Sequence, residues 1–137
     1  MIYKPTPYPI RGPVISVANR PMIKIKLFNR LRSIETLALI DSGADTCLIN
    51  TSWAEALLYD DYKKGRIDGT IGISGNPQNV YYHDLEYEVS DVPGHKFTIP
   101  FGFVSGMNAS ILLGRLGFFD KYIINFDFKN SIFEVKI

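Results

Sequence analysis

The chain has 137 residues, of which 46% are hydrophobic and 21% charged, so it can bury one sizeable core but is short for two ordinary domains. Its net charge of +1 gives no general electrostatic reason to expect binding to nucleic acid or to a membrane. The single cysteine, Cys47, excludes an internal disulfide, and one Cys with two distant His residues offers no metal-ligand spacing. We therefore expect a reducing, cytoplasmic location and no metal or organic cofactor.

Residues 1–19 are predicted to form an extended, proline-rich arm ahead of one domain over residues 20–137. Four prolines among the first fifteen residues exclude a helix there. Seven Lys or Arg and no acid fall within residues 1–34, so a basic arm for nucleic acid is conceivable. Because these charges are interleaved with apolar residues, as on the wet face of a strand, they argue against that interpretation. No apolar run reaches the ~18 residues of a membrane span, and we expect no membrane partner.

The composition favours an all-β fold. Eight tyrosines and nine phenylalanines suit pleated surfaces, while eleven glycines and eight prolines punctuate turns. Apolar and charged side chains alternate over residues 22–27, which is typical of a strand with one buried face. A polar loop over residues 29–33 predicts a hairpin, with residues 34–40 as the returning strand. That strand leads directly into Asp41-Ser42-Gly43.

The middle of the chain predicts a short helix and a long hairpin. Ser52 and Glu55 have the spacing of a capping box, so we expect a helix of about two turns over residues 52–59. Glycines and a proline among small or polar residues predict a hairpin over residues 70–80. Its tip is expected at residues 74–77.

The last third of the chain predicts strands, a brief helix and a terminal hairpin. Alternation over residues 85–89 and a Pro-Gly turn predict a hairpin whose second strand covers residues 97–103. Residues 111–113 form a continuous apolar run, which is typical of a strand covered on both faces. A second brief helix is expected over residues 114–122, and residues 123–137 predict a hairpin.

Two segments carry candidate chemistry. Asp41-Ser42-Gly43-Ala44-Asp45-Thr46 follows an apolar strand, and Ile111-Leu112-Leu113-Gly114-Arg115 is a second apolar strand that stops at a glycine. With the glycine-containing hairpin between them, they resemble the retropepsin-like aspartic protease family. The resemblance covers about residues 20–137 and implies a closed β-barrel with a flap hairpin and one or two short helices. Because residues 123–137 extend past the point where retroviral members end, the chain is more similar to cellular and bacterial members.

The chemistry of that family requires two carboxylates. Peptide hydrolysis needs one group that takes a proton from water and another that gives a proton to the carbonyl oxygen. Two carboxylates about 3 Å apart do both, because repulsion leaves one proton between them. The sequence has one Asp-Ser-Gly, since Asp68-Gly69-Thr70 lacks the intervening hydroxyl residue. A two-fold homodimer would supply the second carboxylate, so the resemblance implies a dimeric aspartic endopeptidase acting on extended peptide or protein substrates.

The resemblance also implies roles for individual residues. Asp41, Ser42 and Gly43 are implied as catalytic, with Ser42 bonding across the dimer and Gly43 leaving room for the backbone to approach. Asp45 and Arg115 are implied as an ion pair within one chain. The implied substrate-binding residues are Ala44, Asp45, Ile71, Ile73, Ser74, Gly75, Ser110 and Leu112. Asn76 and Pro77 stand where retroviral flaps have glycines and isoleucine, so the tip residue stays open.

Three other interpretations remain open. A peptide-binding module could keep the barrel without catalysis, although binding alone gives no reason to keep Asp41, Ser42 and Gly43. A β-barrel with a basic arm would bind nucleic acid with a steep salt dependence. A β-rich protein with an Asx-type turn at Asp41 would have no active site there.

Overall fold

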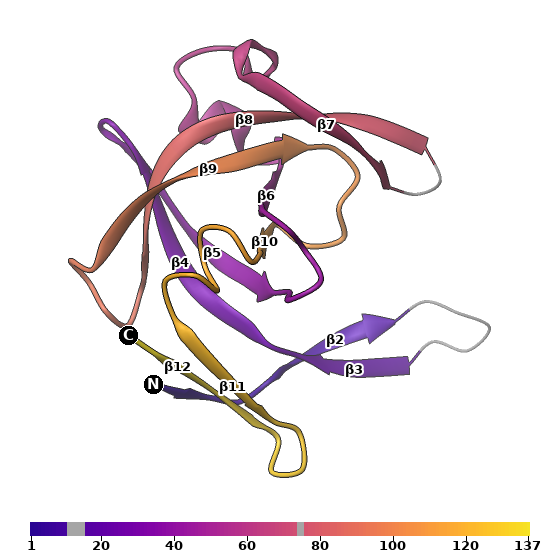
Figure 1. The fold of residues 1–137 in the computed structure, drawn as a ribbon, viewed down its shortest axis with the longest axis vertical. Helices are drawn as coiled ribbons and strands as arrows, with labels where there is room; N and C mark the ends of the chain where they lie inside the picture. Colours follow the sequence, from indigo (N-terminus) through magenta and orange to yellow (C-terminus); the bar gives the residue numbers. More distant parts are fainter. Residues whose placement is uncertain (11–15, 74–75) are drawn as a thin grey trace.

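The computed structural model describes the backbone of residues 1–10, 16–73 and 76–137, and their side chains outside residues 6–19 and 69–77. This part of the chain is almost entirely β (Figure 1). Its strands are β1 (Ile2–Tyr3), β2 (Thr6–Ile10), β3 (Ser16–Arg20), β4 (Met22–Asn29), β5 (Arg32–Ile40), β6 (Cys47–Asn50), β7 (Arg66–Ile73), β8 (Asn76–Val89), β9 (Lys96–Val104), β10 (Ile111–Leu113), β11 (Ile123–Asp127) and β12 (Ile132–Lys136). The helical segments are η1 (Thr51–Trp53), α1 (Ala54–Leu57) and η2 (Tyr62–Lys64). The predicted all-β fold is confirmed.

Six strands close into a barrel. Within the described residues, a seven-stranded sheet has the order β4-β5-β10-β6-β9-β8-β7, and a further pairing of β4 with β8 closes its first six strands. β7 stays outside this closure as the partner of β8 in a long hairpin. Two pairings are parallel, β5 with β10 and β6 with β9. β10 therefore lies between the strand that ends before Asp41 and the strand that follows the Asp41 loop.

Alternation along the strands decides which side chains fill the barrel. Ile23, Ile25 and Leu27 are fully buried, while Lys24 is exposed, as the period of two residues in a strand requires. The largest buried side chains include Tyr87, Phe101, Phe103, Phe118 and Phe133. A slip of one residue in the pairing of β8 with β9 would turn the ring of Tyr87, or those of Phe101 and Phe103, toward solvent, so this aromatic packing fixes the register.

The two ends of the chain pair with each other outside the barrel. β1, β12 and β11 form a three-stranded sheet, in which Tyr3 lies opposite Phe133 and stacks on its ring at 5.2 Å. The predicted terminal hairpin is confirmed as β11 and β12. β2 and β3 form a separate two-stranded sheet, so the described part of the extended arm expected at the start of the chain is mostly strand. The division into an arm over residues 1–19 and a domain over residues 20–137 remains a prediction.

The first predicted helix is shorter than expected. In place of a helix over residues 52–59, η1 leads into α1, which has four residues. Asn50 caps this segment, because its Oδ1 accepts a hydrogen bond from Ser52 N at 3.1 Å. The capping box expected from Ser52 and Glu55 was therefore wrong, since an Asx residue two positions earlier takes the role. Among the described residues, no helix is long and apolar enough to cross a membrane.

The second predicted helix does not form. Residues 114–122 make a series of turns. Leu116 is held in a parallel β-bridge to Thr46, and Gly117 has a φ of +107°, outside the range of a right-handed helix. The tertiary contact of Leu116 and the backbone of Gly117 therefore override the local helical pattern.

Candidate active site

Asp41 lies at the carboxyl end of β5, beside the end of β10. Leu112 and Leu113 of β10 pair in parallel with Leu39 and Ile40 of β5. The Asp41 amide donates a hydrogen bond to Leu113 O at 3.0 Å. Because the two strands run in the same direction, the residues that follow them emerge at the same edge of the barrel. The structure therefore brings the two sequence motifs together.

The turn after Asp41 holds its carboxylate. Gly43 N donates to Asp41 Oδ1 at 2.9 Å, and Ala44 N donates to Asp41 O at 3.2 Å, as in an Asx-type turn. A Cβ at position 43 would lie 3.2 Å from Asp41 Oδ1, so a side chain there would crowd the carboxylate. Asp41 is half-buried, while Ser42 and Gly43 are exposed. The backbone therefore binds one carboxylate oxygen on a turn whose outer side is accessible.

Residues 113–116 form a cradle for the Asp41 loop, residues 41–46. Arg115 N donates to Ala44 O at 2.8 Å, and Leu116 N donates to Asp45 O at 2.9 Å. A Cβ on Gly114 would lie 2.2 Å from Thr46 O and 2.7 Å from Ala44 O. These are backbone atoms that cannot rotate away, so the close approach of loop and cradle requires glycine.

Cys47 lies beneath the loop and bonds to the cradle. Its sulfur accepts a hydrogen bond from Gly114 N at 3.3 Å, and its thiol donates to Leu116 O at 3.6 Å. Burial raises the pKa of the Cys47 thiol from 9.0 to about 12. The thiol is therefore protonated at neutral pH and acts as a small buried packing group.

The predicted ion pair of Asp45 and Arg115 lies on the surface of the same loop and cradle. Arg115 Nη1 is 3.9 Å from Asp45 Oδ1, with the Arg115 side chain 70% and the Asp45 side chain 91% exposed. Water screens such a pair, so it contributes about 0–1 kcal/mol. The expected contact is present, but the backbone hydrogen bonds of Arg115 and Leu116 also join the two segments. Substrate binding by Asp45 remains a prediction.

An apolar cluster lies next to the cradle on the outer face of the barrel sheet. We call it the floor, and it consists of Leu48, Val80, Tyr82, Val104, Met107 and Leu112. Leu113 points into the barrel core, so its neighbour Leu112 points to the opposite face. Gly102 makes room beneath the floor, because a Cβ there would lie 2.4 Å from Val80 Cγ1. Ser110 precedes β10 and its carbonyl accepts from Asn50 N at 2.9 Å.

β7 and β8 form the hairpin that the sequence predicted, and it projects beyond the barrel wall (Figure 1). Its ribbon pairs residues 70–73 with residues 76–79, and a register shift at residues 67–70 marks a β-bulge. The expected hairpin is therefore confirmed as backbone. The side chains of Ile71 and Ile73, and all of Ser74 and Gly75, lie outside the described residues. Their roles in substrate binding remain predictions.

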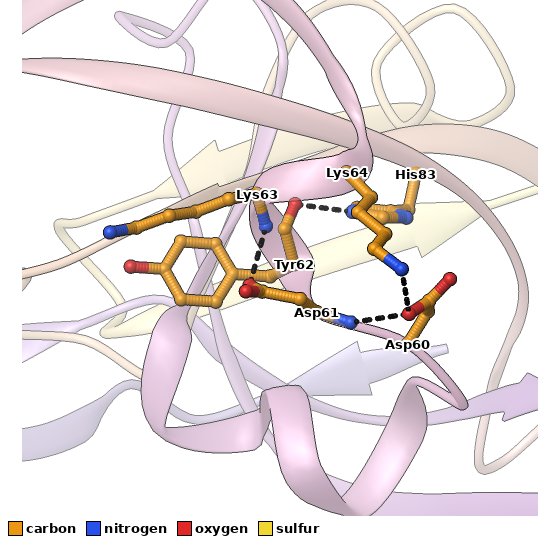
Figure 2. Close-up of polar contacts among 6 residues, drawn as sticks. All are labelled: Asp60, Asp61, Tyr62, Lys63, Lys64 and His83. Carbon is orange, nitrogen blue, oxygen red and sulfur yellow. Dashed lines mark hydrogen bonds and ion pairs between the residues drawn. The ribbon is translucent and has the colours of Figure 1, made fainter.

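A wide hollow of about 890 Å³ lies elsewhere, over residues 50–62. Figure 2 shows that polar groups of this region bind one another: Lys64 Nζ lies 2.8 Å from Asp60 Oδ1. His83 Nε2 lies 2.7 Å from Tyr62 O, and it must donate because a carbonyl oxygen only accepts. Neither the Asp41 loop nor the cradle lines this hollow, so it is separate from the candidate site.

One side-chain contact joins the flap hairpin to the Asp41 loop. Tyr82 Oη lies 2.8 Å from Thr46 Oγ1, and both residues are half-buried. Sequence reasoning assigned no role to either residue. The available signal was that Val80 and Tyr82, two residues apart in a strand, share one face. Which residues this face of β8 contacts depends on the pairing of β8 with β9. The local sequence does not specify that pairing.

The comparisons with known proteins agree with this geometry. The model of the retroviral aspartyl protease family matches residues 17–116, which include the Asp41 loop, the flap hairpin and the cradle. No curated protein sequence matches the chain.

Solved structures that share the fold include two proteases. A retropepsin-like aspartic protease from Rickettsia conorii is 19% identical with a TM-score of 0.59, over 97% of this chain and 95% of that one. EIAV protease, solved with the inhibitor HBY-793, is 20% identical with a TM-score of 0.52, over 71% of this chain and 83% of that one. These identities support the fold alone. The family model covers most of the sequence, and the chain therefore belongs to the retroviral aspartyl protease family, with a retropepsin-like fold.

Proposed function

We propose that this protein is an aspartic endopeptidase that works as a homodimer, with Asp41 of each chain in one shared active site. The observation that carries the proposal is the position of Asp41. Its carboxylate is bound by Gly43 N on an accessible turn, held by the cradle and next to an apolar floor. Membership of the retroviral aspartyl protease family supports the proposal.

The proposed mechanism follows from two carboxylates that share one proton. The ionised Asp41 takes a proton from a water molecule as that water attacks the scissile carbonyl carbon, and the protonated Asp41 gives its proton to the carbonyl oxygen. Proton transfer to the amine then releases the two peptides. The titration belongs to the pair and not to either residue. Within each chain, the Gly43 amide orients one carboxylate oxygen before substrate arrives.

Dimer formation is supported by what the monomer leaves uncovered. The exposed turn at Ser42 and Gly43 can approach its copy across a two-fold axis, where isologous contact places like residues together. Large apolar side chains are also exposed on or beside the three-stranded terminal sheet: Ile2, Ile123, Phe126, Phe128 and Ile137. A partner that covers such residues would gain free energy from removing them from water.

The proposed substrate is an extended polypeptide that lies over the floor and under the flap ribbon. Apolar walls favour hydrophobic side chains beside the cut bond. The residues proposed to contact it are Ala44, Asp45, Ile71, Ile73, Ser74, Gly75, Ser110 and Leu112. We keep a cytoplasmic, reducing location as part of the proposal, supported by the lone buried thiol of Cys47.

The direct test is cleavage of a peptide library from about pH 4 to about pH 7, the range in which a carboxylate pair can share a proton. We expect Asp41→Asn to lower kcat by about 1,000-fold or more, while Asp68→Asn retains wild-type activity. Asp68 is a control because it is an exposed aspartate beside a glycine that lacks the Asp-Ser-Gly order of the Asp41 loop. Peptide binding without cleavage by the wild type would favour the alternative, a catalytically silent binding module.

A mixing experiment tests the shared site. Excess Asp41→Asn chain should exchange into wild-type dimers and lower the activity per wild-type chain toward zero, because one carboxylate and one amide cannot share a proton between two acids. Activity should also fall on dilution below the dimer dissociation constant. Constant activity per wild-type chain, with subunit exchange confirmed, would mean that each chain acts alone.

A further inference from the structure

We propose that Tyr82 is a positioning residue, whose hydroxyl bond to Thr46 holds the base of the flap hairpin against the loop that carries Asp41. This inference deepens the proposed function and rests on it for any effect on cleavage. The mechanical coupling between hairpin and loop stands on the geometry alone. The two oxygens are 2.8 Å apart and join residues 36 positions apart in the chain.

Tyr82 occupies the point where β8 leaves the barrel wall. It pairs with Arg66 on β7 and with Gly102 on β9. Tyr81, opposite Phe103, is the last residue toward the tip that pairs with β9. Beyond it, residues 76–79 pair with β7 in the part of the chain that the structure describes. Val80 packs in the floor with Leu48 and Val104, so motion of residues 76–79 relative to the barrel must turn about residues 80–82.

The neighbouring strand bends at the same level. Ile67 lies opposite Tyr81, and the β-bulge of β7 falls between Ile67 and Thr70, where an extra residue increases twist and bends the ribbon. The inner face of the base also lies against the segment of Figure 2, because His83 Nε2 donates to Tyr62 O and a Cβ on Gly65 would lie 2.5 Å from His83 Nε2. The hydrogen bond of His83 joins β8 to η2, whereas the hydrogen bond of Tyr82 joins β8 to the Asp41 loop.

Thr46 is a fixed partner for Tyr82. Its backbone bridges to Leu116, and its carbonyl packs against Gly114. The Tyr82 ring lies over Gly102, whose missing side chain leaves it room, since a Cβ there would be 3.0 Å from Tyr82 Cε1. The ring is thus placed by β9 and the hydroxyl by the loop. Loss of one neutral hydrogen bond of this kind should change the equilibrium between docked and undocked base by about 3- to 10-fold.

The test uses variants that remove or keep one hydroxyl. Tyr82→Phe and Thr46→Val each remove it with little change of shape, while Thr46→Ser keeps it. Tyr81→Phe is the matched control, because Tyr81 points to the opposite face and packs edge-on against Tyr62. Amide hydrogen exchange of residues 76, 78 and 79 should be about 3- to 10-fold faster in Tyr82→Phe and Thr46→Val. Thr46→Ser and Tyr81→Phe should exchange like the wild type.

The double variant Tyr82→Phe with Thr46→Val separates a shared bond from two independent effects. If the two hydroxyls act through one bond, the double variant exchanges no faster than either single variant. Additive acceleration, or unchanged exchange in Tyr82→Phe, would overturn the proposal. These measurements decide the coupling even if the wild type cleaves nothing, in which case the proposed function alone fails.

Peptide cleavage gives the second measurement. The KM of Tyr82→Phe should rise about 3- to 10-fold with kcat within about two-fold of the wild type. The reason is that the contacts of Asp41 with Gly43 and Leu113 do not pass through Tyr82, so the hydroxyl acts on substrate capture. A loss confined to kcat at unchanged KM would contradict positioning through the flap.

Discussion

The Asp41 loop is joined to its cradle on two sides, and the two sides differ in strength. On the surface, Arg115 Nη1 lies 3.9 Å from Asp45 Oδ1 with both side chains largely in water. Below, Gly114 N donates to the buried sulfur of Cys47 at 3.3 Å, and Gly114 itself packs against the backbone of Thr46. The charged pair is the contact that the sequence suggests first. The uncharged side, which excludes water, carries the larger share of the free energy.

The strongest way to break the buried side is Gly114→Ala. The new Cβ would meet Thr46 O at 2.2 Å, and relief requires backbone movement, so we expect a loss of about 3 kcal/mol or more in the free energy of unfolding. Denaturant unfolding measures it. Gly94→Ala is the control, because Gly94 has a φ of +89° but no atom within 4 Å of the added Cβ, and it should lose about 1 kcal/mol. Equal losses would show that close packing at Gly114 is unimportant.

Removing the thiol tests the same side more gently. Cys47→Ala deletes a buried group that bonds both Gly114 N and Leu116 O, and we expect it to lose about 1–2 kcal/mol in urea unfolding. In the wild type, the Cys47 thiol should react with a disulfide reagent near neutral pH only as fast as the protein unfolds. Rapid labelling of the folded protein would contradict the buried position.

Alkaline pH should weaken the buried side and not the ion pair. The Cys47 pKa is raised from 9.0 to about 12, so the unfolded chain loses this proton at lower pH than the folded chain. The contribution of the protonated Cys47 thiol to the free energy of unfolding is therefore fully present below about pH 9. It falls as the pH rises toward 12, by up to about 1.4 kcal/mol per pH unit. Burial also raises the pKa of Tyr87 and of Tyr122, which adds to the fall. The Cys47→Ala variant should show a shallower slope, and an equal slope would contradict this assignment.

The smallest effect should come from the surface side. Arg115→Ala should change the free energy of unfolding by less than about 0.5 kcal/mol, because an exposed pair contributes little and Arg115 N keeps its bond to Ala44 O. Asp45→Ala is the matched partner, and high salt should leave the wild type nearly unchanged. A loss above about 1 kcal/mol for Arg115→Ala would reverse the ranking of the two sides.

Much of the fold could be predicted because the signal was local. The alternation over residues 22–27 predicts β4 and its buried face, and the apolar run over residues 111–113 predicts β10. The second helix failed because the bridge of Leu116 to Thr46 is a tertiary contact that competes with local propensity.

The candidate site was predictable to the same extent. The resemblance located Asp41, and the structure places Leu112 in the floor, but the contact of Tyr82 with Thr46 depends on strand pairing across the barrel, which no local pattern encodes. The position of the Asp45 and Arg115 pair was foreseen, whereas its exposure required the structure.

The parallel pairing of β5 with β10 has a consequence for the time course of folding. Cys47 and Gly114, which join the loop to its cradle, are 67 residues apart, and Asp41 bonds to Leu113 across a similar separation. Contacts between such distant residues form late and require closure of a long stretch of chain. A nascent chain still on the ribosome has no cradle for Asp41 until β10 has emerged. Under the proposed function, an active site can therefore assemble only after β10 has been synthesised.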